Sequence, residues 1–472
     1  MVKHWLAAGV CLLLGCEQAS TTPSMSAAGA SGGGGAGGSI AAGTGGVAGG
    51  TLAGMTGGMA PLGMSGVGSA GGAAGSSAGS AGEAGAGGGE APDAGPPVDL
   101  SAELYDEASL PRFDITLPES SVGALQADSE TYVTGELRYG DEVVRNIGVR
   151  IKGEGSLRTL DEKAAFKLKL DEFVPMQTFR GLRRMTFNNM VEDPSFLAER
   201  LAYEVFRAAE LPAPRCNNAL IYVNDQFYGV YANVETEDKT FLRRWFADED
   251  GNLYEEGQVD FESGAELEFD LETNEMEDDR SDLRALIGAL ESATPTTFLT
   301  DMSGVLDTAH FLRFTAAEAL VNQWDMYGYT VFYPNNFRLY HDPTTAKFVF
   351  LPWGMDMSMK PFRDSGKPHI AIYVLARGGD RDRGPVTAGL MFQRCMDSDE
   401  CTAQYTEAVR ELLAVYEGAD LEAKAAAYYA QIKDFVAMDP RREYSDEQFE
   451  VGYEKLLTTI RTRGDAVRAD ID

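Results

Sequence analysis

Residues 321–340 have the sequence VNQWDMYGYTVFYPNNFRLY, and this stretch decides how the second half of the chain is interpreted. Asp325 stands among aromatic residues, and Asn335 and Asn336 stand at the far end. A second aspartate, Asp356, follows in LPWGMDMSM. The preceding run TAHFLRFTAAEALVNQW has helical spacing, and FRLYHDPTTAKFVFLPW predicts a hairpin. An aspartate after a helix, then an asparagine, then a hairpin closing on another aspartate is the order of the catalytic and metal-binding loops of protein kinases.

The chemistry that this order suggests is phosphoryl transfer from ATP, which needs few protein groups. An acid is oriented on the acceptor hydroxyl, Asp and Asn oxygens hold a divalent metal, and a lysine contacts the phosphates. Here Asp325 is the candidate acid, and Asn335 or Asn336 with Asp356 are the candidate metal ligands. The candidate phosphate contacts lie in the first half, in GVRIKGEGS and the strand pattern after it: Lys152, Lys163 and Lys167.

Each of these signals also has an ordinary structural explanation. Ten or eleven residues separate Asp325 from the two asparagines, whereas a protein kinase has about five at this point. A single aspartate beside a tryptophan is more often a buried, hydrogen-bonded loop residue than a catalyst. The glycines of KGEG are more often a strand bulge than a phosphate cradle. The residue pattern alone therefore leaves the catalytic interpretation open.

The chain opens with a pattern that predicts an export signal. MVKHWLAAGVCLLLGC (1–16) has a short basic start and then an apolar run of about ten residues, too short to span a bilayer. Its LLGC ending resembles the lipobox of bacterial lipoproteins, which implies cleavage before Cys16 and lipidation of its sulfur. An ordinary secretory signal with an incidental cysteine is the alternative. We therefore expect an exported protein held by lipid in a bacterial envelope, at the outer membrane or the cell surface.

Residues 17–97 are almost wholly Gly, Ala and Ser. Such a segment buries too little apolar surface to offset its ordering entropy, so we expect a flexible tether, with an adhesive Gly-rich segment as the alternative. The formal net charge of −33 argues against nucleic acid as a partner and favours basic or metal-bearing partners. Solubility alone explains most of this charge.

The chain contains five cysteines and four histidines. In an exported protein, the short loop CMDSDEC predicts a local disulfide between Cys395 and Cys401, which leaves Cys216 as a lone buried thiol. No cysteines or histidines have zinc-ligand spacing, and the scarcity of histidine disfavours a Ser-His-Asp hydrolase. A metal-dependent hydrolase built on the same acids is a weaker possibility for the same reason.

The remaining residues predict an α+β fold of two lobes. Residues 98–260 alternate strand patterns and turns, with one helix that Asp193 can cap and Pro194 can begin. Residues 261–282 are acidic and have too few large apolar side chains to pack deeply, so we expect a solvated insertion that attracts a basic acceptor protein. Helical periodicity dominates residues 283–472, with one hairpin as the exception.

Seven stretches of the chain together resemble one protein family. In order they are GVRIKGEGSLRTLDEKAAFKLKL, FRGLRRMTFNNMVEDPSFLAERLAYEVFRAAELPAP, LIYVNDQFYGVYANVETEDKTFL, DGNLY, NQWD, NNFRLY and FVFLPWGMD. From about Phe113 to Met359 the chain resembles the CotH family, the spore-coat-protein-H-like atypical protein kinases. The resemblance implies a kinase-like fold with a β-rich N-terminal lobe and a mainly helical C-terminal lobe. It also implies ATP with Mg²⁺ or Mn²⁺, and phosphorylation of protein serine or threonine hydroxyls.

Carried over by position, the family's functional residues fall on candidates already named. The aspartate after the family's long second-lobe helix falls on Asp325. The asparagine before its aromatic-x-Leu-Tyr strand falls on Asn336, and the last aspartate of its PWDxD segment falls on Asp356. The lysine before its aromatic-basic strand falls on Lys163, and Lys167 is the basic residue four positions further on.

One further candidate lies on the first-lobe helix, and two residues differ from the family's motifs. Glu199, on that helix, is the candidate acid that orients a phosphate-contacting lysine. Gly354 stands in place of the first aspartate of PWDxD, and Glu255 in place of the basic residue that often follows NLY. Both changes weaken metal or nucleotide binding, so a pseudokinase that holds a partner, or an adhesin-like surface protein, is the alternative. If the chain is a kinase, we expect a basic, serine-rich acceptor protein.

Overall fold

The fold is that of a computed structural model, which describes residues 99–330, 333–361, 369–373 and 388–472. These residues all belong to one compact unit, 90–472. The predicted export signal, Cys16 and the tether lie outside the described residues. In the part of the chain that is described, no helix combines the length and the apolar character needed to cross a membrane.

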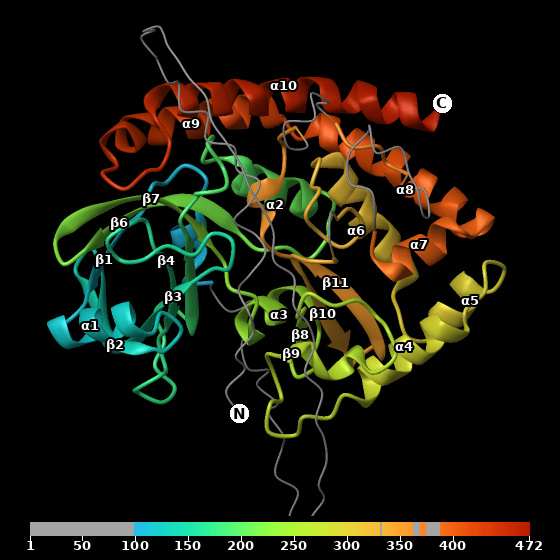
Figure 1. Cartoon of the computed structure of the whole chain (residues 1–472), viewed down its shortest axis with the longest axis horizontal. Helices are drawn as coiled ribbons and strands as arrows, with labels where there is room; N and C mark the ends of the chain where they lie inside the picture. The colour runs from blue at the N-terminus through green and yellow to red at the C-terminus, as the bar shows by residue number, and fades with distance from the viewer. Residues whose placement is uncertain (1–98, 331–332, 362–368, 374–387) are drawn as a thin grey trace, which may run out of the picture. The chain divides into compact units, whose positions relative to one another are not determined.

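The first half forms a closed barrel with the strand order β1-β2-β3-β4-β5-β7-β6 (Figure 1). The strands are β1 Arg112–Thr116, β2 Val133–Tyr139, β3 Glu142–Lys152, β4 Ala165–Lys169, β5 Arg184–Asn188, β6 Cys216–Val223 and β7 Gln226–Val234. Alternate side chains point inward and fill the barrel with apolar groups, Phe113, Phe166 and Phe187 among them. The predicted sheet closes because β1 and β6 pair in parallel, with Arg112 opposite Leu220.

Local signals in the sequence set two of the connections. The β6–β7 hairpin turns at Asn224 and Asp225, whose φ angles are 49° and 64°, as the favoured two-residue hairpin turn requires. Helix α2, Ala198–Ala208, begins at the residue whose backbone N–H donates to Asp193 at 2.8 Å. It begins later than Pro194 predicted, because Ser195 first folds back onto the same carboxylate.

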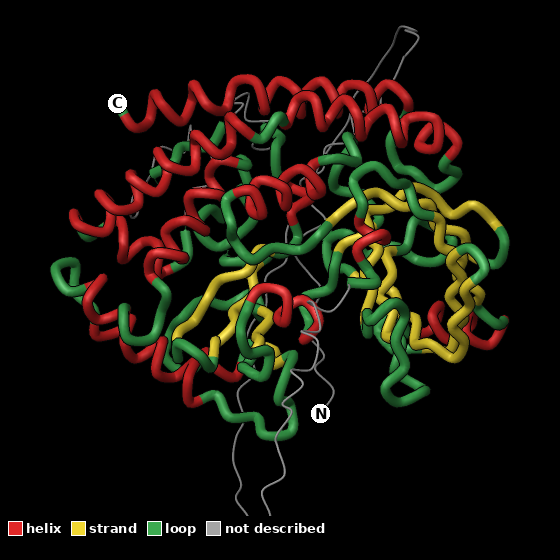
Figure 2. Tube along the Cα trace, turned by 180° about the vertical axis from the view of Figure 1, so that it is seen from behind, coloured by secondary structure: helices red, strands yellow, loops and turns green. Residues whose placement is uncertain are grey.

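The second half is mainly helical and holds a smaller sheet of order β11-β10-β8-β9. Its strands are β8 Leu253–Glu255, β9 Asp270–Leu271, β10 Phe337–Asp342 and β11 Lys347–Pro352. The helices besides α2 are α1 Glu119–Ala127, α3 Lys239–Trp245, α4 Ser281–Ser292, α5 Phe298–Met302, α6 Thr308–Leu320, α7 Leu390–Met396, α8 Asp399–Gly418, α9 Leu421–Met438 and α10 Asp446–Ile471. Figure 2 shows the two sheets apart from one another, with α9 and α10 running along one edge of the molecule.

The acidic segment 261–282 packs more deeply than expected. Phe261 and Phe269 are buried, with ring centroids 5.4 Å apart, and β9 pairs with β8. Two aromatic rings thus anchor a segment whose other side chains are mostly polar. Because β8 pairs with β10 and not with a barrel strand, the boundary expected at residue 260 cuts through the smaller sheet.

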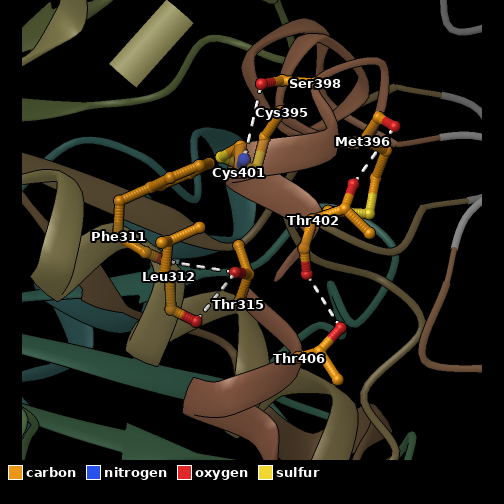
Figure 3. Close-up of a disulfide and its surroundings, with 9 residues drawn as sticks. All are labelled: Phe311, Leu312, Thr315, Cys395, Met396, Ser398, Cys401, Thr402 and Thr406. Atoms are coloured by element: carbon orange, nitrogen blue, oxygen red, sulfur yellow. Dashed lines mark hydrogen bonds between the residues drawn. A yellow bond between two sulfur atoms is a disulfide. The ribbon is translucent and has the colours of Figure 1, made fainter. Parts of the chain in front are cut away.

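A disulfide between Cys395 and Cys401 joins α7 to α8 (Figure 3). Ser398, between the two cysteines, accepts a hydrogen bond from the backbone N–H of Cys401 at 3.4 Å and so caps α8. Thr402 donates to the carbonyl of Met396 at 3.2 Å. The turn between these helices is therefore held both covalently and by hydrogen bonds. Cys216 is a free, buried thiol in β6.

Candidate active site

Several predicted site residues converge where the barrel meets the second half. Lys152 is the last residue of β3, and Glu199 lies in the first turn of α2. Asp356 lies in a short 3-10 turn, Met355–Met357, that packs against α2. Asp325 lies beyond the end of α6, within electrostatic reach of Asp356. A strand, a helix, a 3-10 turn and the loop after α6 thus bring together residues far apart in the sequence.

Asn188 connects the lysine and the glutamate of this group. The Nζ of Lys152 donates to the side-chain oxygen of Asn188 at 2.6 Å, and the Asn188 amide donates to both carboxylate oxygens of Glu199 at 2.9 Å. Burial lowers the pKa of Lys152, although Glu199 and then Asp356 oppose the shift. Burial, followed by the charge of Asp356, raises the pKa of Glu199 to about 7. We did not predict Asn188, and its place at the polar end of a buried strand was the available signal.

Asn336 holds Asp325. Its side-chain amide donates to the main-chain oxygen of Asp325 at 2.7 Å and to the carboxylate at 3.1 Å. The amide of Asn335 reaches the same carboxylate at 3.4 Å, and the backbone N–H of Asn336 donates to Glu256 at 3.0 Å. The long stretch between the aspartate and the asparagines therefore does not separate them.

The aromatic residues after Asp325 anchor its loop in the helical half. Tyr327 and Tyr329 are fully buried, and the hydroxyl of Tyr329 lies 2.5 Å from that of Tyr405 on α8. Glu318, a buried residue of α6, accepts the backbone N–H of Gly328 at 3.1 and 3.2 Å. Packing on one side and a buried acceptor on the other fix the loop that carries Asp325.

Asp356 is half-buried, and among the residues that the structure describes none forms a hydrogen bond or an ion pair with its carboxylate. After burial, its charge is the largest cause of the raised pKa of three neighbouring acids, Glu192, Glu199 and Asp325. The site is therefore a cluster of acids whose negative charges raise one another's pKa values, and the charge of Lys152, on its barrel side, only partly opposes this effect.

This cluster fits a hard divalent cation in its donor chemistry. Carboxylate and amide oxygens are the ligands that Mg²⁺ and Mn²⁺ prefer, and a cation would offset the repulsion that raises the neighbouring pKa values. Within the described ranges, no three His, Cys, Asp or Glu side chains are grouped closely enough to hold a metal. A metal at the predicted position would therefore need an amide oxygen of Asn335 or Asn336 beside Asp356.

Gly354 has a local reason to be glycine in this chain. Its φ is +57°, in the left-handed region. A Cβ at this position would lie 2.2 Å from the side-chain oxygen of Asn336. The Asn336 amide thus occupies the space into which an aspartate at this position would project, and the departure from the family's pattern is accommodated by a neighbouring candidate ligand.

The other two predicted lysines are not brought to this cluster. Lys163 is buried and forms an ion pair with Asp439, which precedes α10, so its ammonium is already neutralised and far from solvent. Lys167 lies on β4 opposite Arg150 and faces a separate cavity. A cation that sequence reasoning missed is Lys360, which donates to the backbone of Glu192 at 2.6 Å and whose charge opposes the raised pKa of Asp325.

Comparison with known proteins places the chain in a family. The family described as CotH kinase protein matches residues 149–467. The chain belongs to the CotH family. The inner spore coat protein H of Bacillus subtilis (strain 168) is 25% identical to this CotH protein over 304 residues, 62% of this chain and 79% of that protein. Among solved structures, the Helicobacter pylori proinflammatory kinase CtkA is similar at 13% identity, over 72% of this chain and 89% of that one, with a TM-score of 0.31.

Membership confirms the family resemblance that the sequence motifs carried. The closed barrel followed by a mainly helical half confirms the α+β fold class. The match begins at residue 149, within β3, and therefore includes every residue of the acid cluster and Lys152.

Proposed function

We propose that this CotH family member is an ATP-dependent protein kinase that transfers the γ-phosphate to a serine or threonine hydroxyl of an acceptor protein. The observation that carries the proposal is the unpartnered carboxylate of Asp356. It lies in one half-buried cluster with Asp325, Glu199 and Lys152. Uncompensated carboxylates beside a lysine are what a metal and a polyphosphate together would neutralise.

The residues have distinct roles in this proposal. Lys152 contacts the phosphates, and Asn188 with Glu199 fixes its position. Asp325 orients the acceptor hydroxyl and accepts its proton as the new O–P bond forms and the bond to ADP breaks. Asp356 and an asparagine oxygen hold Mg²⁺ or Mn²⁺. The metal, when bound, supplies positive charge against the charge developing on the phosphoryl group.

Burial and the neighbouring charge of Asp356 favour Asp325 as a proton acceptor. Burial and then Asp356 raise its pKa, whereas its hydrogen bonds with Asn335 and Asn336 oppose the shift. A raised pKa makes the carboxylate a better proton acceptor near neutral pH. The two asparagine amides also fix the carboxylate in one orientation, which lowers the entropic cost of placing it against the hydroxyl.

We propose further that the mature protein is lipid-anchored through Cys16 on the outside of a bacterial cell. The support is the LLGC ending of the apolar start and the Gly-rich tether after it. The net charge of −33 favours a basic acceptor, and a serine-rich one supplies hydroxyls. Mass spectrometry of the N-terminal peptide from membranes tests the anchor: a diacylglyceryl mass on Cys16 supports it, and an unmodified cysteine contradicts it.

The main competing function is a non-catalytic surface protein that holds a partner. Gly354 favours it, because the Asn336 side chain lies where the family's aspartate would project. Thermal stability distinguishes the two. ATP with Mg²⁺ or Mn²⁺ should stabilise a kinase, since a ligand that binds only the folded state raises its melting temperature, whereas a purely adhesive protein should not respond.

The deciding experiment is transfer of labelled γ-phosphate from ATP by the purified full chain to a basic, serine-rich protein. Asp325→Asn and Asp356→Ala should each abolish transfer, and Asp325→Asn should keep nucleotide-dependent stabilisation. Asp434→Asn, which removes an exposed carboxylate of α9, is the matched control and should transfer normally. Undiminished transfer by Asp356→Ala would remove the cluster from the mechanism. Absence of both transfer and stabilisation in the wild type would favour the partner-holding function.

A further inference from the structure

A second group of cations lies on the outer face of the barrel. Inward side chains of β3, β4 and β5 fill the core, so the alternate side chains point outward. The strand register places Arg150 directly opposite Lys167, and Lys169 directly opposite Arg184. Like charges directly opposite one another on neighbouring strands are destabilising, so these two pairs need an explanation.

Among the described residues, carboxylates at ion-pair distance are found for only one of the two pairs. Lys169 forms an ion pair with Glu172 at 2.8 Å, and Arg184 forms one with Glu272 at 2.7 Å. Across the described residues, neither Arg150 nor Lys167 has a carboxylate within ion-pair distance.

These two unpaired cations differ in their surroundings. The Lys167 side chain is only 9% exposed, and burial lowers its pKa to about 8. The guanidinium of Arg150 lies 5.4 Å from the ring centroid of Tyr132. The charges of Glu272 and then Glu255 oppose this shift, so the ammonium has counter-charge nearby but, among the described residues, no direct ion pair. A buried ammonium of this kind is stabilised further by an anion at contact distance.

Both unpaired cations line the same cavity. It has a volume of about 450 Å³ and lies between the outer face of the barrel and β9, which is a size that accommodates a small molecule. Tyr132 forms part of its wall, and the second half contributes Arg280 and four acids. The acids are Asp270, Glu272, Glu275 and Asp278, and the barrel side also contributes Lys169 and Arg184. Neither Asp356 nor any of the three acids around it lines this cavity.

We infer that this cavity binds the phosphate group of a small molecule, with Arg150 and Lys167 as its direct ligands. A guanidinium offers two parallel N–H donors to phosphate oxygens, and the neighbouring ammonium adds a point charge. Together they match a phosphate dianion, while the surrounding carboxylates disfavour larger polyanions such as nucleic acid. The phosphate can belong to inorganic phosphate compounds or to a nucleotide. The site stands apart from the proposed transfer, because it uses none of the acids around Asp356.

The test measures binding of inorganic tripolyphosphate to the full chain in EDTA, by calorimetry and thermal shift. EDTA keeps divalent metal from the Asp356 cluster, and the variants at residues 150 and 167 distinguish binding in the cavity from any binding at Lys152. Tripolyphosphate should stabilise the wild type and Asp356→Asn equally. Lys167→Met and Arg150→Met should each weaken binding about tenfold, the equivalent of ~1.4 kcal/mol, and Lys167→Arg should restore it. Lys433→Met, which removes an exposed lysine of α9, should bind as the wild type does.

Two further measurements separate binding from folding and identify the source of the phosphate. Binding should weaken as salt increases, and less steeply in Lys167→Met, which a purely structural role would not produce. AMP should bind through Lys167 and adenosine should not. Adenosine binding that is lost in Lys167→Met would overturn the inference, because the cavity would then hold the nucleoside. No binding of tripolyphosphate, binding undiminished in both methionine variants, or binding lost in Asp356→Asn would also overturn it.

Discussion

The side-chain oxygen of Asn336 lies only 2.2 Å from the point where the Cβ of any residue other than glycine would be at position 354. The same amide group donates to both the main chain and the carboxylate of Asp325. Glycine at this position therefore sets the orientation of Asn336, and through it that of Asp325. A substitution at residue 354 should therefore move Asp325 indirectly, by displacing the Asn336 side chain that binds it.

Gly354→Ala should both destabilise the protein and reduce phosphate transfer. A left-handed φ costs a residue with a Cβ roughly 1–2 kcal/mol, and the methyl group displaces the Asn336 amide. We expect at least a tenfold loss of transfer and a lower urea midpoint. Gly288→Ala, in an exposed turn of α4 with open space around it, is the control and should be neutral or stabilising. Equal transfer by the two variants would show that Asn336 does not position Asp325.

Lys163→Met should mainly lower the stability of the protein, whereas Lys152→Met should mainly abolish phosphate transfer. Lys163 is buried against Asp439, so its loss leaves a buried carboxylate unpaired and should cost on the order of 3–5 kcal/mol of stability. Transfer by this variant, assayed well below its melting temperature, should persist. Lys152 is half-buried, and its loss should abolish transfer with a smaller change in the urea midpoint. A stable Lys163→Met variant without transfer would instead make Lys163 the phosphate contact.

Asn188→Ala should weaken the use of ATP more than it weakens the fold. It breaks the link between Lys152 and Glu199, and loss of such an orienting residue typically costs roughly 10–100-fold in function. We expect KM for ATP to rise or kcat to fall within this range. Asn217→Ala, which removes a buried asparagine of β6 bonded to the carbonyl of Asp106, is the matched control. A similar kinetic defect in both variants would point to general destabilisation.

Glu318 should make stability depend on pH in a defined direction. Burial raises its pKa from 4.5 to about 8, so between these values the folded state keeps a proton that the unfolded state has released. Stability therefore falls as the pH rises through this window. Glu318→Gln removes the titrating group. The free energy of unfolding of this variant, measured relative to that of the wild type, should therefore increase by about a few kcal/mol as the pH rises from 4.5 to 8.5.

Chemical denaturation at a series of pH values measures this difference. Glu454→Gln, at an exposed position of α10, should show a constant difference from the wild type over the same range. A constant difference for Glu318→Gln as well would mean that its carboxylate is not held protonated in the fold.

Elements set by neighbouring residues were predictable from the sequence. The Asn224-Asp225 turn and the order of Asp325, Asn336 and Asp356 follow from local chemistry. The predicted helix start was wrong by several residues: Asp193 accepts a hydrogen bond from Ala198, but the N-cap of α2 is Leu197. The family resemblance rested on those same short motifs.

Contacts between distant segments were not predictable in this way. Closure of the barrel depends on a parallel pairing of β1 with β6. The alternation within a strand shows which face is buried, but it does not show which distant strand will be its partner. Lys163 was assigned to phosphate by position along the chain, whereas its partner Asp439 lies 276 residues away. No local pattern distinguishes a lysine that will be buried against a distant carboxylate from one that will face a ligand. The polar end of β5 marked Asn188 as a candidate, but it did not show that this residue would lie between Lys152 and Glu199.

The ion pair between Lys163 and Asp439 also constrains how the protein is made. Lys163 lies just before β4 and obtains its counter-charge from a residue 276 positions further along the chain, after the last barrel strand. A barrel that forms before α9 and α10 assemble on it therefore has to keep Lys163 hydrated or deprotonated. The surroundings of this lysine are completed only when the helical half packs against the barrel, which makes the two halves depend on one another for folding.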